Sequence, residues 1–295
     1  KVFVMIREKL KNNVNLVNAY LMWSARLINN YLRGLSGDNK KINLKKQESL
    51  VILCNGPSLN KFLQKLNKYE NYDYMAVNFF PNNSEWFEKL RPKYLCIIDS
   101  DYLNINNLDF QNNRMGLINS LSKADWKINL LTYSFQKLDV KSCNIQHLKI
   151  NTNTIDTFEF NSFIKKMFEY NYAIPPICNV AVFALFNAIR MGYKKIFIAG
   201  LDMSFHTSIY VDKNNDVIQI LKHFYGEEQI NLSKKKDYIQ SKGMTGLFHD
   251  WYYTFSGFEC MKKYAESKNI QIYNTCIESY VDIFDKIEFE KVNNV

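Results

Sequence analysis

The chain has few of the residues that bend or break a backbone, with 10 glycines and 5 prolines among 295 residues. This scarcity excludes collagen-like and low-complexity classes. No apolar run approaches the ~18–20 residues that a membrane span needs, so no transmembrane segment is predicted. The chain is 47% hydrophobic and 15% aromatic, which is enough to bury a full core. One large domain, or one domain with an appendage, is expected at this length.

Cysteine and histidine are also scarce and widely spaced. The six cysteines form no C-x-x-C pair, which predicts free thiols rather than a zinc site or a disulfide framework. The four histidines show neither H-E-x-x-H nor i, i+4 spacing, so a histidine zinc site is not expected. The G-x-G-x-x-G fingerprint of dinucleotide folds and the G-K-[ST] end of a P-loop are both missing. The motifs therefore suggest neither NAD nor ATP as a cofactor.

Positive charge is concentrated at the N-terminus. Residues 1–47 hold ten Lys or Arg against two acids, whereas residues 48–295 hold 28 basic and 27 acidic side chains. A groove for nucleic acid would need a basic body, so nucleic acid is not expected as a partner. Apolar residues recur near helical spacing between the basic ones of residues 2–23. Residues 1–47 are thus predicted to form a basic amphipathic helical leader and a linker. Its helix would lie on an anionic membrane surface or pack on the domain or a partner subunit.

Strands and helices alternate along residues 48–295, which are predicted to form the main domain. Strands are expected at 49–54, 72–77, 94–98, 128–132, 147–150, 195–199 and 270–273. Helices are expected at 84–90, 180–191 and 251–268. A further helix would begin after Ser58 as its N-cap, and a short one would end near Phe284. This order predicts an α/β fold with a Rossmann-like, mostly parallel sheet and helices on both faces. Residues 201–248 are predicted to be a long insert that serves as a lid or acceptor-binding segment.

Polar residues follow four of the expected strands. Asn55, Asn78, Asp99 and the run Gly200-Leu201-Asp202 each come after an apolar stretch. In open α/β sheets, ligands bind at the carboxyl ends of the strands, near the switch in strand order. The four strand ends therefore predict a nucleotide-sized pocket.

Two of these strand ends, and also His249, have a chemical interpretation beside a structural one. The turn Asn55-Gly56-Pro57-Ser58 would bring the backbone close to a ligand and offer N–H groups to a phosphate, or it is simply a tight strand-to-helix turn. Asp99-Ser100-Asp101 has the acidic spacing that holds Mn²⁺ or Mg²⁺ against a nucleotide diphosphate, a pattern that also arises by chance. His249 precedes a predicted helix, whose positive end favours a neutral imidazole that accepts a proton; a structural histidine is the alternative.

The order of these motifs resembles that of the bacterial lipooligosaccharide sialyltransferases. The resemblance spans residues 49–284 and rests on Asn55-Gly-Pro-Ser-Leu59, Met191-Gly-Tyr193, Lys195-Ile-Phe-Ile-Ala-Gly-Leu-Asp202, the long insert and His249. It implies an inverting, metal-independent glycosyltransferase whose donor is CMP-sialic acid or a related CMP-nonulosonic acid. A glycan or lipid-linked oligosaccharide would be the acceptor. The resemblance also implies a homo-oligomer, and with the basic leader it suggests a cytoplasmic enzyme peripheral to the inner face of the cytoplasmic membrane.

The resemblance implies a role for each matching position. Asn55 and Gly56, within the turn completed by Pro57 and Ser58, would face the CMP phosphate and sugar. Asn78 would contact the nucleotide, and Gly200, Leu201 and Asp202 would contact cytosine and ribose. Tyr210 would hold the leaving phosphate, and His249 would be the general base. The chain departs from the family pattern at Ser204, where a second phosphate tyrosine is expected, at Asp99, where an asparagine is expected, and at Asn179-Val180, where small hydroxyl residues are expected. These departures leave the donor sugar open.

Two other functions remain open on sequence grounds. In the first, Asp99-Ser-Asp101 binds a divalent metal in a transferase that uses a nucleotide-diphosphate sugar. In the second, the chain is a non-catalytic nucleotide- or glycan-binding protein that its basic helix localises at a membrane.

Overall fold

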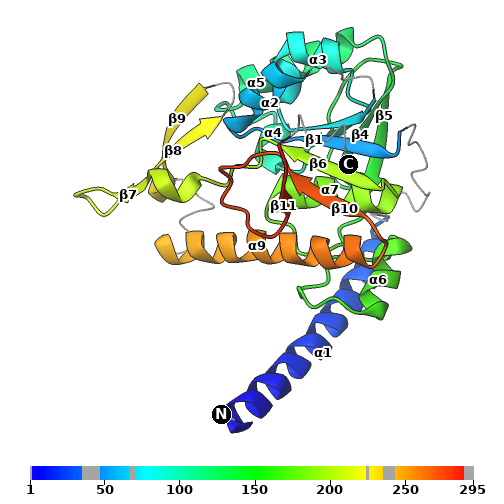
Figure 1. Cartoon of the computed structure of the whole chain (residues 1–295), viewed down its shortest axis with the longest axis vertical. Coiled ribbons are helices and arrows are strands. Elements are labelled where there is room, and N and C mark those ends of the chain that lie inside the picture. Colours follow the sequence, from blue (N-terminus) through cyan, green and yellow to red (C-terminus); the bar gives the residue numbers. More distant parts are fainter. Residues whose placement is uncertain (1, 35–46, 67–70, 224–225, 235–242, 289–295) are drawn as a thin grey trace.

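The computed structural model describes residues 2–34, 47–66, 71–223, 226–234 and 243–288 (Figure 1). Its body is an eight-stranded sheet in the order β11-β10-β6-β1-β2-β3-β4-β5, with parallel neighbours throughout. The strands are β1 (Ser49–Leu53), β2 (Asp73–Val77), β3 (Tyr94–Cys96), β4 (Ile128–Tyr133), β5 (Ile145–Ile150), β6 (Lys195–Ala199), β10 (Gln271–Asn274) and β11 (Asp285–Lys286). The strand order reverses at β1, between β2 and β6. The predicted α/β fold with a mostly parallel sheet is confirmed.

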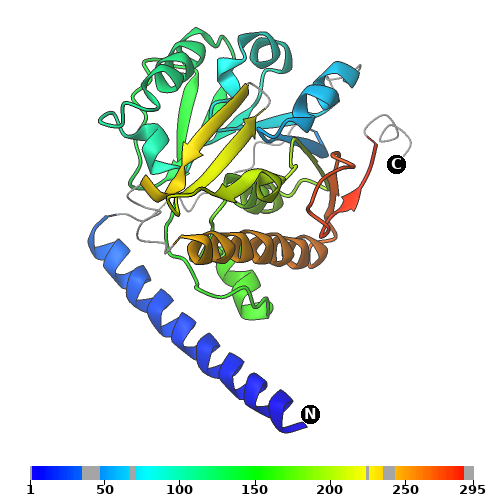
Figure 2. The ribbon, with the colours of Figure 1, turned by 90° about the vertical axis from the view of Figure 1, so that its left-hand side faces the viewer.

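Helices cover both faces of this sheet (Figures 1 and 2). They are α1 (Val2–Leu32), α2 (Ser58–Lys65), α3 (Ser84–Leu90), α4 (Ser100–Leu103), α5 (Gln111–Lys123), α6 (Ser162–Glu169), α7 (Val180–Met191) and α9 (Met244–Glu266). Alternate residues of β1 serve the two sides, because side chains of a strand point to opposite faces. Val51 and Leu53 pack with buried residues of α2, α3 and α5, whereas Leu50 and Ile52 pack with those of α6, α7 and α9.

The insert at 201–248 is not the long loop that the sequence analysis expected. It contains a three-stranded antiparallel sheet of β7 (Ile209–Val211), β8 (Val217–His223) and β9 (Gly226–Asn231), flanked by 3-10 turns at Phe205–Ser208 and Leu232–Lys234. The alternation Ile218-Gln219-Ile220 is a strand pattern that the analysis overlooked. A small core of Val217, Ile230, Leu232 and Leu247 supports this sheet. Residues 235–242 of the insert lie outside the described residues.

Three local predictions of helices and caps were wrong. Helix α9 begins at Met244 rather than near Trp251, because Met244, Leu247 and Trp251 continue the helical spacing and Gly243, with φ of 67°, marks the start. The expected short helix before Phe284 is instead a series of turns that leads into β11. At the start of α2 the N-cap position belongs to Pro57, and Ser58 uses its hydroxyl elsewhere.

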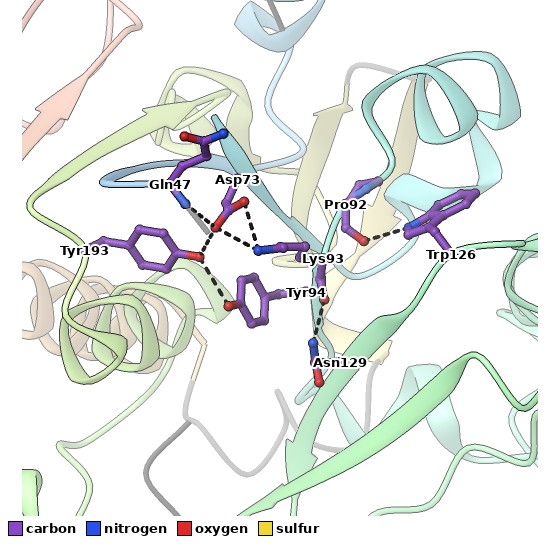
Figure 3. Close-up of polar contacts among 8 residues, drawn as sticks. All are labelled: Gln47, Asp73, Pro92, Lys93, Tyr94, Trp126, Asn129 and Tyr193. Atoms are coloured by element: carbon purple, nitrogen blue, oxygen red, sulfur yellow. Dashed lines mark hydrogen bonds and ion pairs between the residues drawn. The ribbon is translucent and has the colours of Figure 1, made fainter. Parts of the chain in front are cut away.

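The amino ends of the strands are tied together by a buried polar network (Figure 3). The Asp73 carboxylate, 6% exposed at the start of β2, accepts the Tyr193 hydroxyl at 2.7 Å and lies 3.1 Å from Lys93 Nζ. The backbone N–H of Gln47 donates to the same carboxylate at 3.3 Å, and the Tyr193 and Tyr94 hydroxyls lie 3.2 Å apart. Burial raises the pKa of Tyr94 to about 12, so its hydroxyl stays protonated. Every charge in this network has a partner.

A long helix, α1, forms within the predicted leader and extends away from the sheet (Figures 1 and 2). Its C-terminal half is anchored on the segment before α7. Trp23 Nε1 donates to the Tyr172 carbonyl at 3.1 Å, and Arg26 forms a 2.7 Å ion pair with Asp156. Within the described ranges, no helix has both the length and the apolar content of a membrane span. The expected contact of this helix with a membrane or a subunit stays a prediction.

Candidate functional site

A cavity of about 480 Å³ opens at the carboxyl ends of the central strands. Its volume lies within the range of small-molecule sites. Ten predicted residues line it: Asn55, Gly56, Pro57, Asn78, Asp99, Asn179, Gly200, Leu201, Asp202 and Ser204. The turns after β1 and β6 contribute most of them, at the point where the strand order reverses. Ser58, Tyr210 and His249 are not among the lining residues.

Two glycines let the turns after β1 and β6 meet backbone to backbone. The Gly56 N–H donates to the Gly200 carbonyl at 3.0 Å. A Cβ at Gly56 would overlap the Asp202 carboxylate and the Gly200 carbonyl, and a Cβ at Gly200 would overlap the Cys54 carbonyl. Gly200 also has a φ of 72°, which disfavours other residues. The local geometry of the cavity floor therefore requires glycine at both positions.

Asp202 occupies the helix N-terminus that the sequence analysis offered to a phosphate. Its carboxylate accepts the Ser58 N–H at 3.2 Å and the Ser58 hydroxyl at 2.8 Å, with the Cys276 thiol 3.5 Å away. Burial raises the pKa of Asp202, and the Ser58 hydrogen bonds oppose that shift. The start of α2 thus already holds a carboxylate, and Ser58 positions Asp202 instead of capping the helix with its own hydroxyl.

Asn55 and Asn78 present unsatisfied amide oxygens at neighbouring strand ends. Oδ1 of each is buried and has no hydrogen-bond partner among the residues that the structure describes. The Asn55 side-chain NH₂ donates to the Val77 carbonyl at 3.4 Å, which orients the amide. Asn78 has a left-handed backbone with φ of 49°, an uncommon conformation often found at ligand sites. Because both residues also line the cavity, the two oxygens are available to a ligand with hydrogen-bond donors.

The acidic pair proposed as a metal site is divided between two environments. Asp99 lines the cavity and caps α4 by accepting the Asp101 N–H at 2.9 Å, whereas Asp101 is not among the lining residues. In the part of the chain that the structure describes, no three His, Cys, Asp or Glu side chains gather in a metal-binding group.

Several cavity residues escaped the sequence analysis. Tyr133 is the last residue of β4, so the strand-end rule would have found it had it been applied to that strand, whereas Tyr102 lies in α4 and no strand-end pattern indicates it. Burial raises the pKa of Tyr133, which keeps its hydroxyl a hydrogen-bond donor. Asn179, which the sequence analysis did single out, lines the cavity and caps α7 by accepting the Ala181 N–H at 2.8 Å. Among the described lining residues there is no Lys, Arg or His, so hydroxyls and amides supply the donors.

His249 lies in the second turn of α9, so the argument from a helix N-terminus does not apply to it. Its side chain is 62% exposed, its ring lies 4.4 Å from that of Tyr253, and Nδ1 is 3.8 Å from Asp250 Oδ1. The pKa of the Cys178 thiol, which lines the cavity, is raised mainly by burial and further by the carboxylate of Asp250, the neighbour of His249.

Tyr210 lies on β7, in the small sheet, and is 48% exposed outside the cavity lining. Its role toward a leaving phosphate and that of His249 as a base stay predictions.

Together these features define an α/β protein with a nucleotide-sized cavity at the switch point of a parallel sheet. No protein-family model matches the chain, and no curated protein matches it. Among solved structures it is similar to sialyltransferases of Campylobacter jejuni. Cst-I is 15% identical, with 84% of this chain and 83% of Cst-I covered and a TM-score of 0.41.

Two further solved structures give comparable values. An α-2,3-sialyltransferase of the same organism is 18% identical, covers 84% of this chain and 83% of its own, and has a TM-score of 0.38. CstII, solved with the substrate analogue CMP-3FNeuAc, is 14% identical, covers 81% of this chain and 85% of its own, and has a TM-score of 0.38. At these values the function has to be argued from the cavity itself.

Proposed function

We propose that this protein is a glycosyltransferase that moves a nonulosonic acid from its CMP-activated form to a hydroxyl of a glycan acceptor. The reaction inverts the anomeric centre and needs no metal. Two independent features support this proposal. The motif order along residues 49–284 resembles that of bacterial lipooligosaccharide sialyltransferases, and ten of the residues that the resemblance singles out line one cavity.

The observation that carries the proposal is the pair of unsatisfied oxygens of Asn55 and Asn78. An amide oxygen accepts hydrogen bonds, and a phosphate offers none to it. Ribose hydroxyls and the amino group of cytosine are donors, so these two residues suit the nucleoside half of a CMP-sugar. Asp202, at the same edge of the cavity, offers further acceptor oxygens to a ribose.

The cavity offers hydroxyl and amide donors, rather than cations, to the phosphate of a donor. Asp99 and Asp202 line it, and no described lining residue is cationic. A CMP-nonulosonic acid brings one negative charge on its phosphodiester and one on its carboxylate, and hydroxyl and amide donors would have to meet both. Hydroxyls of Tyr102 and Tyr133 can donate to that phosphate, since both residues line the cavity. Preorganised donors of this kind stabilise charge as it develops.

In the proposed reaction, His249 takes the proton of the acceptor hydroxyl while its oxygen attacks the anomeric carbon. The bond from that carbon to the CMP phosphate oxygen breaks, and CMP leaves with the bonding electrons. The transition state resembles an oxocarbenium ion, as in glycoside hydrolysis. Attack from the side opposite the leaving phosphate inverts the centre.

The test is transfer from CMP-N-acetylneuraminate, CMP-legionaminate and CMP-pseudaminate to a panel of oligosaccharides, in wild type and His249→Ala. Loss of a general base lowers kcat by about 10²–10⁴-fold, and His147→Ala, far away on β5, serves as the control. Unchanged turnover in His249→Ala would remove this histidine from the mechanism. Activity that EDTA abolishes and Mn²⁺ restores would favour a nucleotide-diphosphate sugar held by Asp99-Ser-Asp101. Ligand binding without turnover across the panel would indicate a non-catalytic protein.

A further inference from the structure

A second cavity, of about 570 Å³, lies between the leader helix and the body. One wall is α1 around Asn15–Met22, another is the segment 156–159, and the floor is α9 from Tyr252 to Lys263. Helices α1 and α9 lie on the same side of the sheet in both views (Figures 1 and 2). We call this cavity the leader groove. Neither the sequence motifs nor the proposed donor site accounts for it.

Three aromatic side chains meet in the leader groove. The ring of Phe158 lies 5.1 Å from that of Tyr253 and 6.3 Å from that of Tyr252, edge to face in both cases. Tyr252 is 63% exposed, so much of its ring remains open to a ligand. Aromatic faces carry partial negative charge and attract the weakly positive C–H faces of sugar rings.

Hydrogen-bonding groups surround these rings. The amides of Asn15 and Asn18 on α1 and the carboxylates of Glu159 and Glu259 are exposed at the rim. Amides and carboxylates are the groups that sugar hydroxyls pair with most readily. The Arg26–Asp156 ion pair and the bond from Arg26 to the Thr154 carbonyl at 3.0 Å hold α1 against the other wall. Rings beside hydroxyl-binding groups form the kind of surface that binds an oligosaccharide.

The floor of the leader groove continues the helical face on which His249 lies. Residues 249, 252, 253, 256, 259 and 263 recur at steps of three or four and therefore share one face of α9. Fourteen residues separate His249 from Lys263, about 21 Å along the axis at ~1.5 Å per residue. The ring of Tyr253 both contacts His249 and lines the groove. The groove thus begins about one helical turn from the proposed base.

We propose that the leader groove is the acceptor site and binds a neutral oligosaccharide, with Tyr252 and Phe158 stacking on its sugars and its terminal hydroxyl at His249. This inference rests on the proposed function. It gives the leader helix a role in acceptor binding, because one wall of the site is α1. The carboxylates of Asp156, Glu159 and Glu259 outnumber the cations Arg26 and Lys263 of this region, which disfavours a phosphorylated or acidic glycan.

Burial and the carboxylate of Asp156 raise the pKa of Tyr253, and the thiol of the donor-cavity residue Cys178 contributes to the same shift. The Tyr253 hydroxyl therefore stays protonated and can donate a hydrogen bond to an acceptor sugar.

The kinetic test compares acceptor KM and donor KM for Tyr252→Ala and Phe158→Ala. Removal of one stacking ring should raise the acceptor KM about tenfold and leave the donor KM unchanged. Tyr170→Ala is the matched control, since Tyr170 is also 63% exposed but lies outside the groove. The proposal is overturned if both groove variants keep the wild-type acceptor KM, or if Tyr170→Ala raises it equally.

A binding test without donor separates this proposal from the proposed function. The full chain is applied to an array of neutral, phosphorylated and acidic oligosaccharides, in wild type, Tyr252→Ala and Phe158→Ala. Retention of neutral glycans by wild type, weakened at least tenfold in both variants, supports the groove even where no CMP-sugar is turned over. Failure to bind any neutral oligosaccharide, or binding that both variants retain, contradicts it whatever the outcome of the transfer assay.

Discussion

The two ends of the central sheet differ in how their buried polar side chains are hydrogen-bonded. At the amino end, Asp73, Lys93 and Tyr193 satisfy one another within a closed network (Figure 3). At the carboxyl end, Asn55 and Asn78 keep buried amide oxygens without a partner. A satisfied network fixes a structure, whereas an unsatisfied group lowers stability until something binds it. The difference assigns stability to the amino end and ligand binding to the carboxyl end.

The largest effect on stability should come from Asp73→Ala. It leaves the Lys93 ammonium half-buried without its carboxylate and removes the acceptor of Tyr193. Breaking a buried pair costs about 3–5 kcal/mol, here nearer the lower figure because Lys93 keeps some contact with water. Urea denaturation should show this loss, while the Kd for CMP measured on the folded protein should stay at the wild-type value. A change in that Kd would break the assignment of the two ends.

A pair of glycine variants should separate backbone strain from close packing at the carboxyl end. Gly200→Ala and Gly192→Ala both place alanine at positive φ, 72° and 82°, which costs about 1–2 kcal/mol. Only Gly200→Ala adds a clash, with the Cys54 carbonyl, whereas the space beside Gly192 is open. Gly200→Ala should therefore be less stable than Gly192→Ala by about 1–3 kcal/mol in denaturant unfolding and should lose CMP binding. Equal stabilities would show that the two turns separate without cost.

Asn55→Ala should weaken CMP binding more than it lowers stability, the reverse of the pattern expected for Asp73→Ala. It removes an unsatisfied oxygen together with the 3.4 Å hydrogen bond to the Val77 carbonyl, so the free energy of unfolding should fall by only about 0.5–1 kcal/mol. The lost hydrogen bond should weaken CMP binding by roughly tenfold, or about 1.4 kcal/mol, in titration calorimetry. Asn187→Ala is a suitable control, because Asn187 Oδ1 is also buried and unpartnered but lies in the middle of α7, away from the cavity. An unchanged Kd in Asn55→Ala would mean that the nucleoside binds elsewhere.

The smallest effect concerns pH. Because burial raises the pKa of Asp202 in the folded protein, its contribution to stability is full below the ordinary carboxyl pKa of about 3.9 and declines as pH rises through the folded value. Asp202→Asn keeps an acceptor for Ser58 but does not titrate. The stability of wild type relative to Asp202→Asn should thus be greater at pH 3.5 than at pH 7. A relative stability that rises with pH would mean that the Ser58 hydrogen bonds outweigh burial.

Local sequence patterns predict much of the secondary structure and several residues of the candidate site. Apolar runs bounded by turns placed the central strands to within about two residues, and the helix Val180–Met191 was predicted at its observed bounds. The strand-end rule brought Asn55, Asn78, Asp99 and Asp202 together because parallel strands end at one edge of a sheet.

What escaped prediction depends on contacts between distant segments. The bond from Ser58 to Asp202 joins residues 144 positions apart, so no local pattern could show that Asp202 occupies the start of α2. The leader groove likewise needs α1 and α9 to meet, and these helices are separated by most of the chain. The start of α9 was missed for a different reason, since Gly246 looked like a helix breaker but is buried within the helix, where packing overrides its low propensity.

The central claim is that the carboxyl end of the sheet binds CMP without a metal. It is tested most directly by thermal unfolding of the full chain with CMP, CDP, UDP, GDP or ATP, each with EDTA and with Mn²⁺. A ligand at 100 times its Kd stabilises the folded state by about 2.7 kcal/mol, which is visible as a higher Tm. We expect CMP to raise the Tm equally with EDTA and with Mn²⁺. A rise only with UDP or GDP, and only with Mn²⁺ present, would contradict it.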